Sequence, residues 1–147
     1  MDKDVFVRVK GSFTGPQDGD NIELIAPGQF YLKNGAKYIL YDEIDESLGE
    51  PIKNTIKVTP GQVSMRKRGP VVADMAFEEG EERMATYTTP FGSLVLGVTA
   101  RKMTVEETED ELNIKLDYAL EIEYEHTSDC VIDIAVRSRS TGMFPLY

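Results

Sequence analysis

The single histidine of the chain is the first residue to test for catalytic chemistry. His126 lies in the segment 125–129, where Ser128 and Asp129 follow it closely. A Ser-His-Asp unit holds the base between the nucleophile and the orienting acid, and neighbours in one short loop rarely reach that geometry. His126 is therefore predicted to be an exposed residue of a loop over 126–129. One histidine and one cysteine also cannot supply the usual ligands of zinc, so we expect no catalytic residue, metal or cofactor.

Two pairs of arginines are the best candidates for binding an anion. Arg66 and Arg68 alternate on one face of a predicted strand, and Arg137 and Arg139 alternate on one face of another. Apolar residues occupy the opposite faces, so that both pairs point outward or gather at a rim. If the two strands approach each other, four guanidinium groups form an anion site, because each planar fork can grip two oxygens. The alternative is separate surface ion pairs with nearby carboxylates.

Tyr38, Tyr87 and Tyr118 are candidate ligand-binding residues of a different kind. Together with Tyr124 they fall on strand faces that are expected to line the interior of a barrel. Aromatic residues in such positions form plain core when the lumen is filled, and ligand walls when it is left partly empty. Both alternatives remain open from the sequence.

Acidic residues are abundant but lack the spacing of a cation site. Glu78, Glu79, Glu81 and Glu82 surround Gly80, and the chain has no full set of oxygen ligands at the offsets of a calcium loop. This segment is predicted to be a charged hairpin tip.

The strand that positions these residues most clearly runs from Leu112 to Tyr124. Its even positions are apolar or aromatic throughout, and its odd positions are mostly charged. Strict alternation predicts a strand with one dry face and one wet face. A strand of this length would extend roughly 44 Å, and it finds cover for its apolar face most easily by bending around a barrel.

The remaining chain is predicted to be short strands joined by tight turns. The expected strands are 5–13, 22–25, 30–33, 37–44, 53–59, 62–68, 71–78, 82–89, 94–105 and 130–138. Asn34-Gly35 is a strong hairpin signal, Pro27-Gly28 is expected to end a strand, and 45–51 is an acidic loop with room for one helical turn. These elements predict an all-β chain with one domain over 1–147. We expect a single up-and-down antiparallel barrel of about ten strands, with a β-sandwich as the alternative.

Composition limits the partners and the cellular setting. The formal net charge is −10, which disfavours nucleic acid and anionic membrane surfaces. Cys130 is the only cysteine and falls on an apolar face, so a buried, unreactive thiol is expected. The charged N-terminus passes directly into a strand pattern without a secretory signal. A cytoplasmic location is predicted.

Several short motifs together resemble a known family. They are Tyr41-Asp42-Glu43, Asn54-Thr55-Ile56-Lys57-Val58, Arg68-Gly69, Phe77-Glu78-Glu79-Gly80 and Tyr87-Thr88-Thr89-Pro90-Phe91-Gly92, followed by the long strand from Leu112. The chain resembles the YwiB-like family of small bacterial β-barrel proteins over nearly its whole length. The resemblance implies a calycin-like barrel, akin to lipocalins, and it carries over no catalytic residues. The lipocalin Gly-x-Trp signature is absent because the protein has no tryptophan, so a ligand inferred from lipocalins rests on analogy of fold.

Three classes of function follow from these expectations. The first is a non-enzymatic barrel that binds a small apolar or anionic ligand. The second is a protein-interaction module that acts through its outer surface or through the apolar C-terminal tail, 143–147, which would cover a barrel mouth or dock on a partner. An enzyme of unidentified type ranks third. A homodimer is left open.

Overall fold

The described residues of the protein form an all-β fold with ten strands. The computed structural model describes residues 1–14, 21–142 and 144. The strands are β1 (Asp4–Thr14), β2 (Asn21–Lys33), β3 (Ala36–Glu43), β4 (Ile52–Thr59), β5 (Gln62–Arg68), β6 (Ala73–Phe77), β7 (Glu82–Thr89), β8 (Gly92–Glu107), β9 (Glu111–Ile122) and β10 (Glu125–Ser138). Two 3-10 turns, η1 (Glu46–Leu48) and η2 (Arg139–Thr141), complete the secondary structure of the described residues. None of their helical segments is long and apolar enough to cross a membrane.

The strands form one antiparallel up-and-down sheet that curls into a nearly closed barrel. The order is β6-β5-β4-β3-β2-β1-β10-β9-β8-β7, so each strand lies beside its neighbours in sequence, and β1 pairs with β10. The seam lies between β6 and β7, which share only the isolated bridges Val72–Thr88 and Glu78–Glu81. These bridges are one residue out of register, so the regular hairpin expected between 71–78 and 82–89 does not form. The predicted antiparallel barrel of about ten strands is confirmed.

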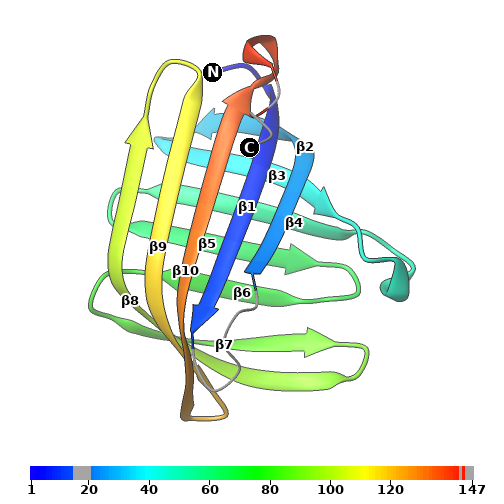
Figure 1. Cartoon of the computed structure of the whole chain (residues 1–147), viewed down its shortest axis with the longest axis vertical. Coiled ribbons are helices and arrows are strands. Elements are labelled where there is room, and N and C mark those ends of the chain that lie inside the picture. Colours follow the sequence, from blue (N-terminus) through cyan, green and yellow to red (C-terminus); the bar gives the residue numbers. More distant parts are fainter. Residues whose placement is uncertain (15–20, 143, 145–147) are drawn as a thin grey trace.

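The barrel is flattened into two layers whose strands cross. In Figure 1, β8, β9, β10, β1 and β2 run along the front, while β4 to β7 cross behind them. The space between the layers is the hydrophobic core. Its largest fully buried side chains include Phe77, Ile39, Ile56, Leu112 and Leu116. The Phe77 and Tyr118 rings meet edge to face within this core, with centroids 5.0 Å apart.

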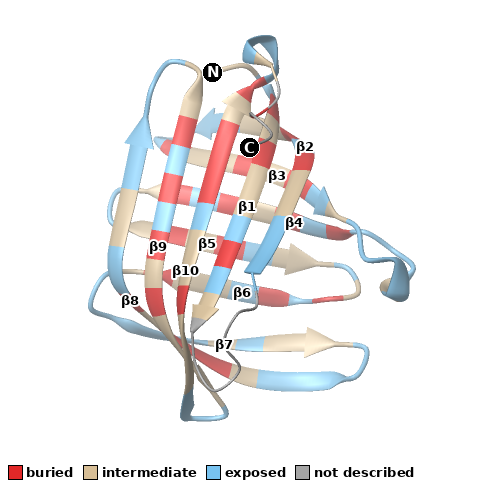
Figure 2. Ribbon diagram, in the orientation of Figure 1, coloured by how far each residue is buried: buried red, intermediate tan, exposed pale blue. Residues whose placement is uncertain are grey.

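Side-chain alternation places the predicted faces correctly along most of β9. Leu112, Ile114, Leu116 and Tyr118 are buried, and Figure 2 shows buried and exposed bands alternating along this strand. The prediction is wrong at Tyr124, which is 73% exposed because the strand has already ended.

The hairpin turn after β9 lies at Glu123-Tyr124, where both residues adopt positive φ angles, 51° and 70°. The loop expected over 126–129 is therefore wrong. This segment belongs to β10, and a bulge between His126 and Ser128 takes up the irregularity. The bulge adds one residue to the strand and breaks the alternation that sequence reasoning relies on.

Strand β2 runs without a break through Pro27-Gly28, where two shorter strands were predicted. A Cβ atom at Gly28 would lie 2.5 Å from the Leu40 carbonyl oxygen and 3.0 Å from Val7 Cγ2. The glycine therefore permits close packing of β2 against its neighbours and does not end the strand. The predicted turn at Asn34-Gly35 is confirmed, with φ angles of 53° and 78°. The acidic loop after β3 contains the single helical turn η1, as the sequence allowed.

Candidate functional site

A row of polar side chains crosses the inner face of the barrel at one end. Tyr41 on β3 lies opposite Asn54 on β4, and Asn54 lies opposite Lys67 on β5. Each residue is in phase with buried apolar neighbours of its own strand, such as Ile39, Ile56 and Met65, so its side chain points inward. Glu43 follows Tyr41 by two residues and shares its face. The pleat of three adjacent strands thus brings polar groups together inside an apolar barrel.

The centre of this row is an ion pair joined to an amide. Lys67 Nζ lies 2.9 Å from Glu43 Oε1 and donates a second hydrogen bond of 2.8 Å to Asn54 Oδ1. The Asn54 amide nitrogen donates to the same Glu43 oxygen at 3.3 Å and to the Ile52 carbonyl oxygen at 3.2 Å. Asn54 is buried, while the side chains of Lys67 and Glu43 are 16% and 34% exposed. The pair is shielded by the barrel but still reachable from solvent.

Two tyrosines flank the carboxylate. Burial, followed by the charge of Glu43, raises the pKa of the Tyr41 phenol well above its ordinary value. Burial and then Glu43 also raise the pKa of Tyr87, which is half-buried near the end of β7. Both phenols therefore carry their protons at neutral pH and can donate a hydrogen bond to a bound group. We refer to Tyr41, Glu43, Asn54, Lys67 and Tyr87 as the mouth cluster.

Polar groups on the inner face of an apolar barrel carry a desolvation cost. Removing two charges from water is expensive, and well-packed hydrophobic residues often replace a buried pair without loss. Both hydrogen bonds that Asn54 and Lys67 donate to the carboxylate use Oε1. An acceptor, an ammonium group and two phenols are thus presented at one end of the barrel. This set can hold a polar group of a ligand.

The three tyrosines named from the sequence have three different positions. Tyr118 is buried in the core against Phe77, and burial raises the pKa of its phenol. Tyr38 faces outward, since its neighbours Ile39 and Tyr41 are buried, and the Lys57 ammonium lies 5.7 Å from its ring centroid. The expectation that Tyr38 lines the interior is wrong, because the inner face of β3 carries the odd-numbered residues. Only Tyr87 belongs to the mouth cluster.

The four arginines do not converge. Arg66 and Arg68 both bind Asp74, at 3.0 Å and 2.9 Å, and hydrogen bonds from Arg68 are the largest cause that lowers the pKa of this carboxyl group. Arg137 pairs with Glu111 at 3.2 Å on the far wall of the barrel, since β5 and β10 are five strands apart in the sheet order. The Arg139 guanidinium lies 5.3 Å from the Phe6 ring centroid. The arginines therefore make separate local contacts, which was the alternative to a shared anion site.

His126 and its neighbours do not form a catalytic unit. The His126 side chain is exposed and lies 3.5 Å from Asp129, whereas Ser128 Oγ contacts Cys130 Sγ at 3.5 Å. Cys130 is buried as expected, and burial raises the pKa of its thiol. Over residues 1–14, 21–142 and 144, no group of three or more His, Cys, Asp or Glu side chains could hold a metal ion.

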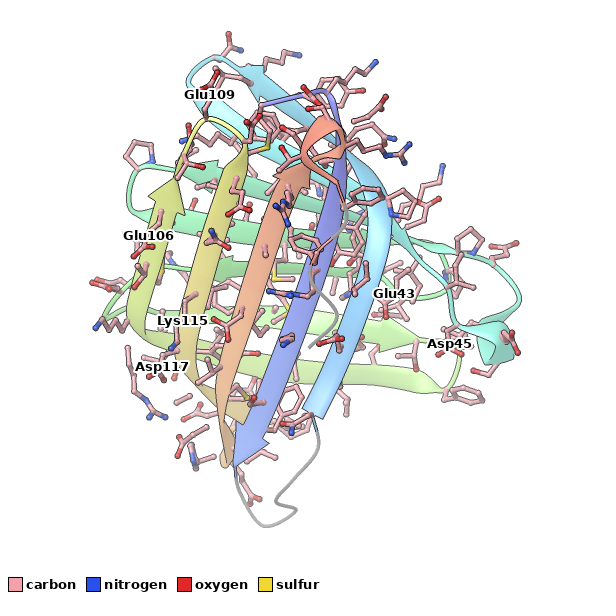
Figure 3. The ribbon with its side chains drawn as sticks, turned by 45° about the horizontal axis from the view of Figure 1, so that its top comes forward. Glu43, Asp45, Glu106, Glu109, Lys115 and Asp117 are labelled. Atoms are coloured by element: carbon pink, nitrogen blue, oxygen red, sulfur yellow. The ribbon has the colours of Figure 1, made fainter. Side chains whose placement is uncertain are left out.

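Two grooves open on the outer wall of the described barrel. One, of about 770 Å³, crosses β1, β10, β9 and β8 and contains side chains of both charges. Its charged lining residues are Arg8, Lys10, Lys102, Glu106, Lys115, Asp117 and Asp133. Figure 3 shows Lys115 and Asp117 on β9. The other, of about 780 Å³, crosses β2, β3 and β4 and includes Leu40 and Ile44. The second groove also borders Tyr41 and Asn54 of the mouth cluster, and Arg139 lines it.

The C-terminal tail reaches the outer wall. Phe144 is buried, and the Arg8 guanidinium lies 4.7 Å from its ring centroid. Arg8 lies on the outer face because Val7 is buried inside. The remaining residues of the predicted tail motif, 143 and 145–147, lie outside the described residues.

The mouth cluster was missed from the sequence, although a signal was present. Asn54 and Lys67 are polar residues in phase with the apolar face of their strands, and Glu43 continues the inner face of β3. Polar residues on the apolar face of a strand can indicate a functional site, because burying a polar side chain costs free energy. Four of the five cluster residues lie in motifs that carried the family resemblance.

Comparison with known proteins agrees with this architecture. The family model described as "Domain of unknown function (DUF1934)" matches residues 7–134. The chain belongs to this family. It is 26% identical over 130 residues to the "Uncharacterized beta-barrel protein YwiB" of Bacillus subtilis (strain 168), a match covering 87% of this chain and 90% of that protein. The crystal structure of the ywiB protein from Bacillus subtilis superposes with a TM-score of 0.77 at 23% identity, covering 90% of each chain. The predicted resemblance to the YwiB-like family is confirmed.

Proposed function

We propose that this protein is a non-enzymatic binding barrel that holds a small, partly apolar ligand at the mouth cluster. The observation that carries the proposal is the inward-facing pair of Lys67 and Glu43, joined by Asn54. Ligand sites are largely apolar cavities in which a few placed polar groups fix orientation. The mouth cluster supplies such groups, and the apolar walls beside it would contact the rest of the ligand.

Packing at the centre of the barrel limits the ligand to the mouth. Because Phe77 and Tyr118 are buried against each other between the layers, we place the ligand at the mouth cluster and not deeper in the barrel. A charged or hydrogen-bonding end of the molecule would then lie against Glu43 and Lys67, with its apolar part toward the rim. A compact molecule with one polar end fits this arrangement.

The proposal also covers the cellular location of the protein and its relation to other barrel proteins. The Bacillus relative and the lone buried cysteine support a bacterial cytoplasmic protein. The up-and-down strand order supports a calycin-like relation to lipocalins, which hold small ligands in barrels of similar build.

Three heptyl compounds with different head groups test the proposal. Heptanoate, heptylamine and heptanol would be titrated into the 15N-labelled protein and followed by the amide resonances of Asn54, Lys67 and Tyr87. We expect one head group to shift these resonances saturably. The absence of such shifts with all three compounds would refute a small-ligand site at the mouth.

The matched variants are Lys67→Met and Lys57→Met. Both remove an ammonium group from neighbouring strands, but Lys57 lies on the outer face over Tyr38. Binding of heptanoate should be lost with Lys67→Met and retained with Lys57→Met, because only Lys67 offers an ammonium group at the mouth. Equal loss in both would show that net charge, and not the mouth cluster, controls the interaction.

A further inference from the structure

The two ends of the barrel have loops of different character. Because the strands run up and down, successive connections alternate between the ends. The connections β2–β3, β4–β5, β6–β7 and β8–β9 share one end. They consist of Asn34-Gly35, Pro60-Gly61, residues 78–81 and residues 108–110, and none of these described residues is a large apolar one.

The opposite end, which contains the mouth cluster, carries an apolar rim. We define the rim as Ile44, Val72, Phe91 and Tyr124, one from each of the four connections that the structure describes completely at this end. Their exposed fractions are 69%, 41%, 89% and 73%. Ile22, at the start of β2 on the same end, is 58% exposed. Leu32 and Val105 near the other end are also exposed, by 68% and 42%, but they lie within strands, whereas the four rim residues lie in the connections around one mouth. Apolar side chains exposed on several loops around one opening are typical of an interaction surface.

The backbone at Tyr124 is unfavourable for a residue with a side chain. Glu123-Tyr124 forms the same kind of two-residue turn as Asn34-Gly35 at the other end, with φ angles of 51° and 70° against 53° and 78°. Such turns favour Asn-Gly because a residue with a Cβ atom is strained at positive φ. A bulky tyrosine at the second position opposes the local preference. It places an aromatic ring in solvent at the tip of the turn.

The charges around the rim indicate the chemistry of the partner. The same four connections contain Asp45, Glu46, Glu50 and Glu123, and none of their described residues is Lys or Arg. Figure 3 labels Asp45 beside η1, in the loop that continues from Glu43. We infer that the rim is a docking surface for a partner protein that presents a cationic amphipathic segment, with apolar side chains on the rim and Lys or Arg against these carboxylates.

Other occupants suit the surface less well. A second copy would bring two acidic rims together on chains with a net charge of −10, and like charges in register cost affinity. An anionic membrane surface would be repelled for the same reason. The inference does not depend on the ligand proposed for the mouth cluster, because it concerns the loop tips and a macromolecular partner.

A pair of designed peptides tests the docking surface. The probes are a fluorescein-labelled amphipathic peptide of Leu and Lys, and a counterpart of Leu and Glu, titrated with the full chain by fluorescence anisotropy. We expect the Leu/Lys peptide to bind, the Leu/Glu peptide not to bind, and Phe91→Ser/Tyr124→Ser to weaken the first at least tenfold. The control is Leu32→Ser, which removes a residue that is 68% exposed near the other end and should leave affinity unchanged.

The opposite results are equally clear. No binding of the Leu/Lys peptide, or equal binding of both peptides, would overturn the inference. So would an equal loss of affinity in Leu32→Ser. If sedimentation velocity shows a dimer of the wild-type protein that the double rim variant abolishes, the rim serves self-association. If the wild-type protein binds phosphatidylglycerol vesicles and the double rim variant does not, the rim serves membrane binding. Thermal unfolding of each variant confirms that the affinities compare folded proteins.

Discussion

Lys67 Nζ lies 2.9 Å from Glu43 Oε1 on the inner face of the barrel, and the same carboxylate oxygen accepts a hydrogen bond from Asn54. The strands around this contact otherwise supply Ile, Val and Met to the interior. In that position each charge needs the opposite charge beside it, because an unpaired charge would lose its hydration without gaining a partner. This mutual dependence makes the contact testable without knowledge of a ligand.

Replacing Lys67 by Met should destabilise the protein. The variant leaves Asn54 Oδ1 without its donor and Glu43 with only the 3.3 Å hydrogen bond from Asn54. We expect the free energy of unfolding to fall by about 2 kcal/mol. This is below the roughly 3–5 kcal/mol for a fully buried pair, because both side chains keep some contact with water. Urea unfolding followed by far-ultraviolet circular dichroism measures the change.

The double variant Lys67→Met/Glu43→Leu shows how much of the loss comes from the unpaired Glu43 carboxylate. Removing both charges should restore half or more of the lost stability, since no unpaired charge remains. If the double variant recovers none of the lost stability, the loss in Lys67→Met does not come from an unpaired Glu43 carboxylate.

The fold could be predicted because alternation is a property of single strands. Leu112, Ile114 and Leu116 reveal the inner face of β9 whatever lies beside them, and tight turns then dictate the order of the strands. The mouth cluster depends instead on register between strands. The turn at Pro60-Gly61 sets Lys67 opposite Asn54, but the pairing of Asn54 with Tyr41 spans the longer connection 44–51, and no local pattern encodes its register. The separation of Arg66 from Arg137 has the same origin.

The local errors also have physical causes. Pro27-Gly28 has the composition of a turn, but tight packing against Leu40 makes the glycine a strand residue. Glu123-Tyr124 lacks the composition of a turn and nevertheless forms one, because the pairing of β9 with β10 and the hydrogen bonds between Glu123 and Val95 hold it. In both places tertiary contacts outweigh local preference.

Tyrosine ionisation should report the integrity of the core. Burial raises the pKa of Tyr41 and Tyr118, so their folded-state values lie above the unfolded value of about 10. The stability that this difference contributes is fully present below about pH 10 and is lost as the pH rises from there toward the folded-state values. Phenolate absorbance of these two residues should therefore appear together with alkaline unfolding.

The variant Tyr41→Phe identifies the signal. It should reduce the absorbance step that coincides with unfolding and make stability less sensitive to alkaline pH. A reduction confined to the phase that titrates before unfolding would show that Tyr41 is accessible as phenolate in the folded barrel.

Replacing Tyr124 by Gly should stabilise the protein while it removes one member of the rim. The substitution relieves a positive φ that costs a side-chain residue roughly 1–2 kcal/mol, partly offset by the greater freedom of glycine in the unfolded chain. We expect a net gain of about 0.5–1 kcal/mol in thermal or urea unfolding. The comparison is Tyr124→Ala, which removes the ring but keeps the strain and should bring no such gain.

Replacing Gly28 by Ala should test the continuity of β2. The added Cβ atom would lie 2.5 Å from the Leu40 carbonyl oxygen, which belongs to the backbone of β3 and cannot turn aside. Strands β2 and β3 must then separate, and we expect a loss of about 2–3 kcal/mol in urea unfolding. Hydrogen exchange should quicken at the amides of β2 and β3 around this position.

The matched control for this variant is Gly11→Ala on the adjacent strand β1. Its added Cβ atom would meet only the Phe13 ring, at 3.4 Å, which is a tolerable contact with the end of a side chain. Both variants add the same methyl group and the same restriction of the unfolded chain, so their difference isolates the clash with β3. Equal stability of the two would mean that β2 bends or breaks at Pro27-Gly28 in solution, as the sequence alone suggested. A large difference would show that the glycine is needed where the barrel wall is tightest.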